Sequence, residues 1–210
     1  MTVFLSKRLR SRKTADSWSE KVRYVIHAPS YFADGKAVGE TIADDPEKLI
    51  GRILQVPLSD INDDYSRMHV ILLFQIIGTR GYAAHTRFRG HSYARDFLRY
   101  LVRRRATRID AIFNTKSQDE IPLRITATAF TTHRAKTSQK EGIRTIMREM
   151  IEETASETSF AELVTITTNG ELAESINRTA SKIFPLKAIE IQKSKVLVPV
   201  EEQTLPELTE

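Results

Sequence analysis

Cysteine is absent from the 210-residue sequence. Its absence excludes disulfide scaffolds, thiolate metal sites and cysteine nucleophiles, and it favours a reducing, cytoplasmic environment. No apolar run approaches the roughly 18 to 20 residues that a membrane-spanning helix needs. The chain is nevertheless 40% apolar, which is enough to build a core. We therefore expect one folded domain rather than a disordered chain.

The first residues lack a secretory signal. In MTVFLSKRLRSRKTADS the basic residues follow the apolar stretch, whereas a secretory signal places them before it. Because the segment is rich in arginine and poor in acids, an organellar transit peptide is an alternative. We favour a basic arm on a cytoplasmic protein, and its charged residues are Lys7, Arg8, Arg10, Arg12 and Lys13.

Residues 87–105, which read RFRGHSYARDFLRYLVRRR, lack lysine and are nearly free of acids. This segment holds seven arginines, no lysine and a single acid, Asp96. The net charge of the whole chain is only +5, yet residues 1–13 carry +5 and residues 87–108 carry +7. The segment after residue 200 carries −4, so the rest of the chain is slightly acidic. Two basic patches on such a background are typical of a protein that binds a polyanion.

The first half of the chain has β composition. Clusters of Pro, Gly, Asp and Asn separate its apolar segments, which lie at residues 21–28, 36–43, 51–58 and 68–77. The run VILLFQII is apolar on both faces, which predicts a central, covered strand. A hairpin turn at 78–81 leads into GYAAHTRFRG, whose period-two alternation puts three side chains together on the outward face: His85, Arg87 and Arg89.

A helix is expected after this strand, with Ser92 as its N-cap and an end near Arg104. At 100° per residue, its apolar side chains fall within one arc: Ala94, Phe97, Leu98 and Leu101. The arginines that gather on the opposite side are Arg95, Arg99 and Arg103. The strand and the helix together would form a broad basic surface. We call it the arginine ledge, and its residues are Arg87, Arg89, Arg95, Arg99, Arg103, Arg104, Arg105 and Arg108.

Residues 109–115 and 122–130 predict a second β-hairpin around the polar turn 116–120. Helices follow, because three residues each precede a glutamate by three positions, the pattern of a capping box. These residues are Ser138, Ser159 and Thr168.

Pro185 ends the last helix, and a final strand is expected after it. The predicted class is therefore α+β: an antiparallel, barrel-like sheet with a basic helix, then a helical C-terminal half and a final strand. We expect a basic arm at 1–20, one domain at 21–198 and an acidic tail at 199–210. The parts of that domain are a β-rich region at 21–132, a helical region at 138–184 and the final strand at 186–198.

Three interpretations of the arginines are open: a solvated surface, a membrane surface and a nucleic acid. A merely solvated surface would use lysine as well and would carry nearby acids. A membrane surface needs large apolar side chains beside the basic stripe, but here they lie on the opposite arc. Guanidinium groups grip phosphates with two parallel hydrogen bonds, and a broad ledge suits the irregular phosphate surface of folded RNA. Zinc-finger spacing, a basic-zipper heptad and an RNP1 motif are all missing from the sequence.

Catalytic motifs are also missing. The histidines show no HExxH spacing, and no glycine-rich phosphate loop is present. His85 and His91 flank the basic segment, where they would assist phosphate binding or pack against the strand. Asp60, Asp63 and Asp64 in SDINDDYS are typical of turns. They also leave one alternative function, a metal-dependent RNA-processing nuclease.

The segment FRGHSYARDFLRYLVRRRATRID resembles the signature of the archaeal and eukaryotic small-subunit ribosomal protein family eS1, also called S3Ae. Further segments of the same resemblance are APSYF, VGETIADDPEKLIGRILQVPLSDI, HVILLFQI, QKEGIRTIMREMIEE and KIFPLKAIEIQKSKVL. They run in order from Tyr24 to Leu197. The resemblance implies a structural, rRNA-bound component of the small-subunit platform near the mRNA exit, without catalytic activity. The short chain with a small acidic tail is more similar to the archaeal members.

The expected partners are therefore small-subunit rRNA, neighbouring ribosomal proteins and mRNA near its exit, in the cytoplasm. No catalytic residue, metal site, cofactor or membrane contact is expected. The residues expected to bind RNA are Lys7, Arg8, Arg10, Arg12, Lys13, Arg87, Arg89, Arg95, Arg99, Arg103, Arg104, Arg105 and Arg108.

Overall fold

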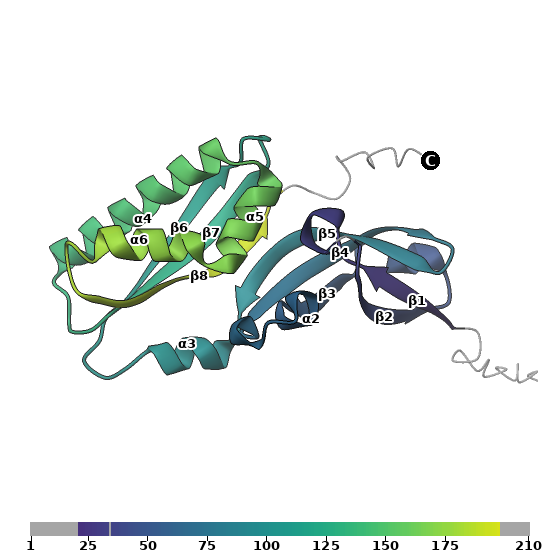
Figure 1. Ribbon diagram of the computed structural model, residues 1–210, viewed down its shortest axis with the longest axis horizontal. Helices are drawn as coiled ribbons and strands as arrows, with labels where there is room; N and C mark the ends of the chain where they lie inside the picture. Colours follow the sequence, from purple (N-terminus) through teal and green to yellow (C-terminus); the bar gives the residue numbers. More distant parts are fainter. Residues whose placement is uncertain (1–20, 34, 198–210) are drawn as a thin grey trace, which may run out of the picture.

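A computed structural model describes residues 21–33 and 35–197 (Figure 1). The strands are β1 (Val22–His27), β2 (Ala37–Ala43), β3 (Ile53–Pro57), β4 (Val70–Arg80), β5 (Ala83–Tyr93), β6 (Arg108–Lys116), β7 (Pro122–Thr131) and β8 (Leu186–Val196). The helices are α1 (Ser30–Ala33), α2 (Ser59–Asn62), α3 (Arg95–Leu101), α4 (Thr137–Glu157), α5 (Phe160–Asn169) and α6 (Glu171–Ala180), with 3-10 turns η1 (Pro46–Leu49) and η2 (Tyr65–Arg67). None of these helices is long and apolar enough to cross a membrane.

The strands form one largely antiparallel sheet. Its order is β2-β1-β5-β8-β7-β6, and a branch runs from β5 through β4 to β3. The expected α+β class, helical C-terminal half and final strand are confirmed, and the run VILLFQII is the inner strand β4, paired on both edges. The sheet is not a closed barrel, because β2, β3 and β6 each pair with a single strand within the described ranges.

β5 joins the N-terminal half of the sheet, strands β1 to β4, to the C-terminal half, strands β6 to β8. One of its edges pairs with β4, whereas the other pairs with β1 near Ala84 and with β8 at residues 90–92. A Cβ atom on Gly90 would overlap the backbone oxygen of Ser194 on β8, so glycine lets these two strands approach closely. The register with β4 shifts just before Gly90 and leaves Arg89 as the extra residue of a β-bulge.

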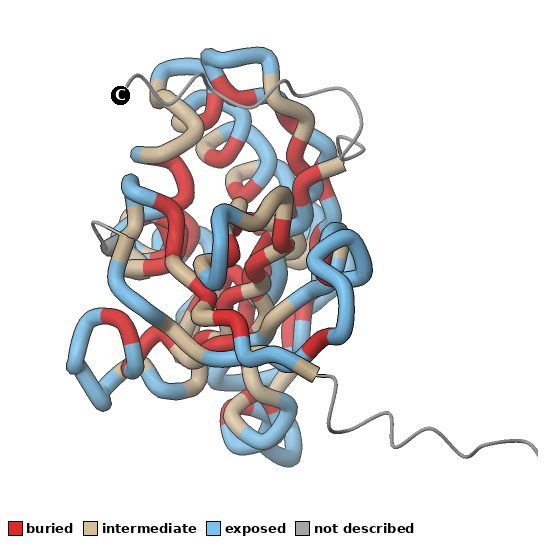
Figure 2. Tube along the Cα trace, turned by 90° about the vertical axis from the view of Figure 1, so that its right-hand side faces the viewer, coloured by how far each residue is buried: buried red, intermediate tan, exposed pale blue. Residues whose placement is uncertain are grey.

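Three helices cover one face of the C-terminal half of the sheet. α4 packs on β6 and α6 packs on β8, as Figure 1 shows. On α4, Ile143, Met147 and Ile151 recur at helical spacing and are fully buried against this sheet. In the N-terminal half, Phe74 and Phe88 pack around the half-buried ring of Phe32. In the view down the long axis, the buried residues gather toward the interior and the exposed ones lie on the outer loops (Figure 2).

The helix after β5 differs from its expected bounds. Ser92 is a strand residue, because it pairs with Ile71 on β4 and Lys193 on β8, and these ladders take the place of a helix cap. The N-cap position belongs to Ala94, which makes no side-chain cap. The helix ends at Leu101 rather than near Arg104, since Val102 is already extended and the chain turns toward β6.

Of the expected capping boxes, the one at Ser159 is confirmed: its hydroxyl accepts a hydrogen bond from the Glu162 backbone N–H. Thr168 is not a cap. It lies inside α5 and donates to the Val164 carbonyl, and Gly170 in the left-handed conformation separates α5 from α6. The capping box predicted at Ser138 is wrong, because α4 begins at Thr137 and Ser138 lies inside it; the N-cap is Lys136, whose backbone N–H donates to the Gln139 side chain.

Candidate nucleic-acid interface

The outward face of β5 carries the predicted strand residues. The alternate residues on the other face are buried: Ala84, Thr86 and Phe88. His85, Arg87 and Arg89 are half-buried on the outward face, which confirms the predicted alternation. Burial lowers the pKa of the Arg87 guanidinium most, Tyr31 partly offsets this, and the charge of Arg89 adds to the lowering. Two like charges are therefore held close together on one strand.

α3 places two more arginines beside the sheet. Its apolar arc is confirmed, since Leu98 and Leu101 are buried in the core. Arg95 and Arg99 lie on the exposed side. Asp96 is 3.8 Å from Arg99, but both side chains are exposed, so this ion pair neutralises little.

A groove of about 420 Å³ lies between α3 and the sheet. Its polar lining consists of Arg95, Arg99, Arg108 and Gln192. Arg108 is already held in place: its Nε donates to Asp110 at 2.8 Å and its guanidinium donates to the Gln192 side chain at 2.9 Å. The groove thus combines one fixed guanidinium with two that face solvent from α3, a geometry suited to an anionic group.

The connection from α3 to β6 carries the remaining predicted arginines. Arg103, Arg104 and Arg105 are exposed. Arg103 lies beyond the end of α3, so the predicted helical stripe of three arginines contains only Arg95 and Arg99. The arginines of the expected ledge therefore lie on the strand β5, the short helix α3 and the loop that leads to β6.

The structure adds basic residues that sequence analysis missed. The α3–β6 connection contacts the loop after β7, because the Ala135 N–H donates to Thr107 Oγ1 at 3.1 Å. That loop contributes exposed Arg134 and Lys136. It also reaches the turn before β8, where the Thr132 N–H donates to the Pro185 carbonyl at 3.2 Å. We call these cations the basic end: Arg103, Arg104, Arg105, Arg134, Lys136 and Lys182. The pairing of β6, β7 and β8 and hydrogen bonds between loops distant in sequence bring them together.

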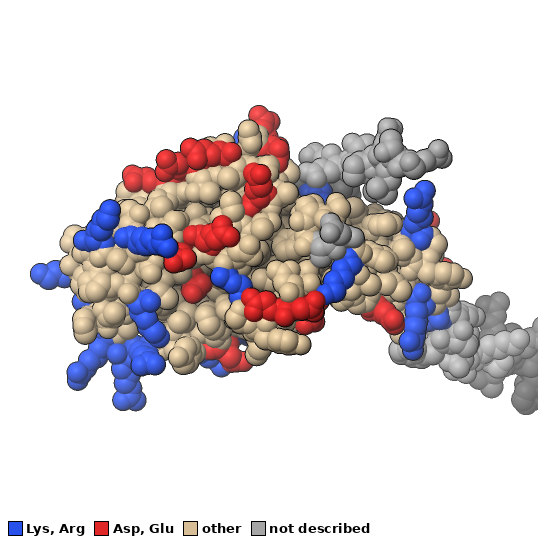
Figure 3. Space-filling view, in the orientation of Figure 1, with Lys and Arg blue, Asp and Glu red and all other residues tan. Residues whose placement is uncertain are grey.

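Charge is segregated over the molecule. In Figure 3, lysine and arginine gather at the end where the α3–β6 connection lies, and acids follow the outer side of α4. The exposed acids in the second half of α4 are Glu149, Glu152, Glu153 and Glu157. A polyanion would be attracted to the arginine ledge and repelled by the α4 surface.

The two flanking histidines have different surroundings. His91 is fully buried and belongs to the packing of β5 against β8: its Nδ1 is 2.6 Å from Ser194 Oγ and its Nε2 is 2.9 Å from the Ile191 carbonyl. His85 lies half-buried, with its ring centroid 6.3 Å from that of His27. His91 therefore packs against the strand rather than facing a phosphate.

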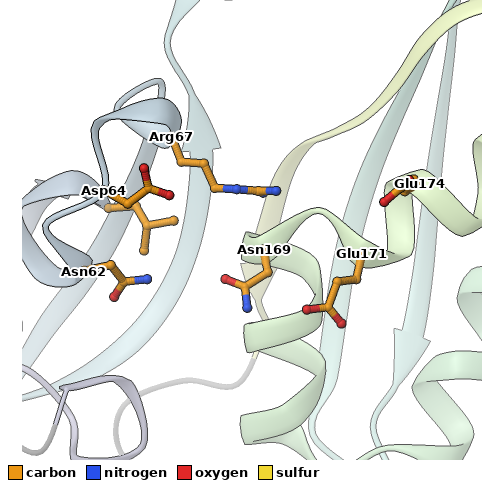
Figure 4. Close-up of a pocket in the computed structure, with 7 residues that line it drawn as sticks. Asn62, Asp64, Arg67, Asn169, Glu171 and Glu174 are labelled. Atoms are coloured by element: carbon orange, nitrogen blue, oxygen red, sulfur yellow. The ribbon is translucent and has the colours of Figure 1, made fainter.

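The aspartate loop uses its carboxylates locally. Asp63 pairs with Lys36 at 3.1 Å, and Asp64 accepts hydrogen bonds from the Ser66 N–H and hydroxyl at the start of η2. Asp64 also lines a hollow of about 350 Å³, which Arg67, Glu171 and Glu174 share (Figure 4). Within the described residues no three His, Asp or Glu side chains gather as metal ligands. This arrangement favours turn chemistry.

Two predicted segments lie outside the described residues. They are the basic arm, with Lys7, Arg8, Arg10, Arg12 and Lys13, and the acidic tail at 199–210. Their predicted roles, like the division of the chain into arm, domain and tail, stay predictions.

Comparisons with known proteins agree with one another. The family model of the ribosomal S3Ae family matches residues 9–199. A protein of Aeropyrum pernix named small ribosomal subunit protein eS1 is 44% identical over 186 residues, which cover 87% of this chain and 86% of the relative. Proteins of the same name from Methanobrevibacter smithii and Methanopyrus kandleri are 40% and 42% identical, over 92% and 87% of this chain and 100% and 88% of theirs.

Proposed function

The chain belongs to the ribosomal S3Ae family, and from this premise we propose that it is a structural component of the small ribosomal subunit that binds folded rRNA. The observation that carries the RNA-binding part is the charge geometry. Arginines lie on one strand, on the short helix that follows it and on the basic end, while Asp96 and Asp110 are the acids beside them and a row of exposed glutamates lies apart on α4. The expected neighbours are rRNA and other small-subunit proteins, in the cytoplasm.

The chemistry of the arginines suits this role. Guanidinium groups are planar and weakly hydrated, so each can hold a phosphate with two parallel hydrogen bonds. Each phosphate contact releases counterions, which makes affinity for RNA strongly salt-dependent. The irregular course of the ledge over a strand, a helix and a loop matches the phosphate surface of folded RNA better than a regular DNA groove.

The finer parts of the function also remain proposals. The basic arm would add contacts to the same RNA, and the position near the mRNA exit would bring mRNA within reach. We propose no catalytic activity, because the aspartates of the alternative nuclease hypothesis serve as turn and ion-pair partners.

Replacing two exposed arginines tests the proposal. Arg99→Glu with Arg103→Glu reverses charge on α3 and on the connection, and both side chains are exposed. We expect a circular dichroism spectrum and an unfolding midpoint close to those of the wild type, but loss of incorporation into small subunits. Incorporation is measured by sedimentation of tagged protein in an archaeal lysate at high salt.

A matched control reverses two charges away from the ledge, with Lys48→Glu and Arg178→Glu. Both residues are exposed and already lie beside acids of their own surfaces. The control should still co-sediment with small subunits. Equal incorporation of both double variants would show that the ledge is not needed for binding.

A further inference from the structure

The sheet has a second exposed face beside the ledge. Helices cover one side of β6, β7 and β8, where Leu123, Ile125 and Val196 are buried. On the other side, among the described residues, α3 lies at one end of the sheet: it lines one groove with Arg108 of β6 and Gln192 of β8, and Lys187 of β8 donates to the Leu101 carbonyl. The remainder, which we call the open face, carries the exposed residues of all three strands.

Strand register shows which side chains share the open face. Cross-strand partners in an antiparallel ladder point to the same side. One row of partners runs Asn114, Arg124, Lys195 and Gly90, across β6, β7, β8 and β5. The next row runs Ile112, Thr126, Lys193 and Ser92. Residues that are far apart in the sequence therefore meet as neighbours.

This face is basic. Its exposed cations are Lys116, Arg124, Lys193 and Lys195. Adjacent strands lie about 4.8 Å apart and alternate residues about 7 Å apart along a strand, so each of these charges has a neighbour within about one Debye length at physiological salt. Among residues 21–33 and 35–197, none of the four forms an ion pair. By the same register the acids on this side are Asp110, which is paired with Arg108, and half-buried Glu190, which accepts a hydrogen bond from the Tyr93 hydroxyl.

The open face continues into the ledge. Gly90 and Ser92 on β5 are the cross-strand partners of Lys195 and Lys193. The outward arginines of β5 are Arg87 and Arg89, just before these two residues. At its other end the face borders the groove of α3, because Gln192 lines that groove and precedes Lys193.

The composition of the face suits the sugar-phosphate backbone rather than bases. Sheets that read single-stranded RNA present aromatic rings for stacking. In β6, β7 and β8 the aromatic residues are Phe113 and Phe130, and both are buried. The polar neighbours of the cations are amides and a hydroxyl, which can contact phosphate oxygens or a ribose 2′-hydroxyl: Asn114, Gln192 and Thr126.

We propose that the open face is a second RNA-binding surface, on which Lys116, Arg124, Lys193 and Lys195 bind the phosphate backbone of the folded rRNA held by the arginine ledge. This inference rests on the proposed function and extends its site across the sheet. One RNA would wrap from the groove of α3 over β8, β7 and β6.

The test compares three variants of the full chain bound to an archaeal small-subunit rRNA transcribed in vitro. The face variant is Arg124→Gln, Lys193→Gln and Lys195→Gln. The ledge variant is Arg95→Gln with Arg99→Gln. The charge-matched control is Lys48→Gln, Arg80→Gln and Arg178→Gln. For each, the logarithm of the association constant is measured against the logarithm of salt concentration, and folding is checked by circular dichroism.

Each lost phosphate contact should reduce the magnitude of the slope by about 0.7 to 0.9. We therefore expect the face variant to lose about 2 to 3 from the slope and the control to change far less. A face variant that behaves like the control, while the ledge variant loses slope, would overturn this inference and leave the proposed function intact; it would assign the open face to a protein partner.

If neither the face variant nor the ledge variant changes the slope, the proposed function itself fails. Should the triple variant fold poorly, Lys193→Gln and Lys195→Gln are measured singly. Each should then lose about 0.7 to 0.9 of slope, and an unchanged slope in both would overturn the inference.

Discussion

The imidazole of His91 is fully buried between β5 and β8, where both of its ring nitrogens form hydrogen bonds in the neutral form. The Ile191 carbonyl can only accept, so Nε2 carries the proton and donates across 2.9 Å. Nδ1 is then the acceptor for the Ser194 hydroxyl at 2.6 Å, and the same hydroxyl accepts from the His91 backbone N–H at 3.2 Å. A second proton would give this buried ring a positive charge and would remove the acceptor of the Ser194 hydroxyl, which disfavours it.

Burial lowers the pKa of His91 from 6.5 to about 4, and the hydrogen bond to Ile191 only partly opposes this. The unfolded chain binds a proton as the pH falls below about 6.5, whereas the folded protein does not until about pH 4. The neutral imidazole therefore contributes to the free energy of unfolding at neutral pH, and this contribution is lost as the pH falls from 6.5 to 4. The linkage relation gives a loss of about 2 kcal/mol between pH 7 and pH 5.

Urea unfolding of wild type and His91→Gln at pH 7, 6 and 5 measures this loss. Burial raises the pKa of Glu190, which acts in the opposite direction, so the difference between the two proteins isolates His91. We expect the variant to be less stable at pH 7 and to lose about 2 kcal/mol less than wild type on acidification. His85→Gln, which removes a half-buried imidazole from the same strand, is the control. If wild type and His91→Gln lose equal amounts of unfolding free energy between pH 7 and pH 5, the role assigned to the buried neutral imidazole is refuted.

Two further predictions concern the strand junction and the aspartate loop. Gly90→Ala places a Cβ against the Ser194 backbone oxygen, so we expect a loss of about 1 to 3 kcal/mol in the free energy of unfolding. Gly78→Ala, at a β4 position where a Cβ meets nothing within 4 Å, is its control. Asp63→Ala should leave structured RNA as intact in the presence of Mg²⁺ as wild type does. RNA cleavage by wild type that this variant abolishes would revive the nuclease alternative.

Local patterns predicted most elements of the fold. Alternation in β5 placed Arg87 and Arg89 on the outward face, and apolar spacing identified Leu98 and Leu101 as the buried side of α3. The same reasoning failed at Ser92, because its role depends on pairing with Lys193, about a hundred residues later in the chain. Cap propensity is a local preference, and tertiary pairing overrides it.

The candidate site was predicted only where it is continuous in sequence. The arginine run identified the ledge, but Arg134 and Lys182 joined it through loop contacts that no local pattern encodes. Lys193 and Lys195 alternate with buried residues in β8 and thus resemble an ordinary amphipathic strand. Their place beside Arg124 follows from the order of strands in the sheet, which the sequence alone does not specify.

Ultraviolet cross-linking of intact small subunits, followed by mass spectrometry of the cross-linked peptides, examines the RNA contacts of this protein in its assembled state. Binding through the arginine ledge predicts RNA adducts on peptides spanning residues 87–108. Adducts confined to the acidic second half of α4, with residues 87–108 free of RNA, would contradict it.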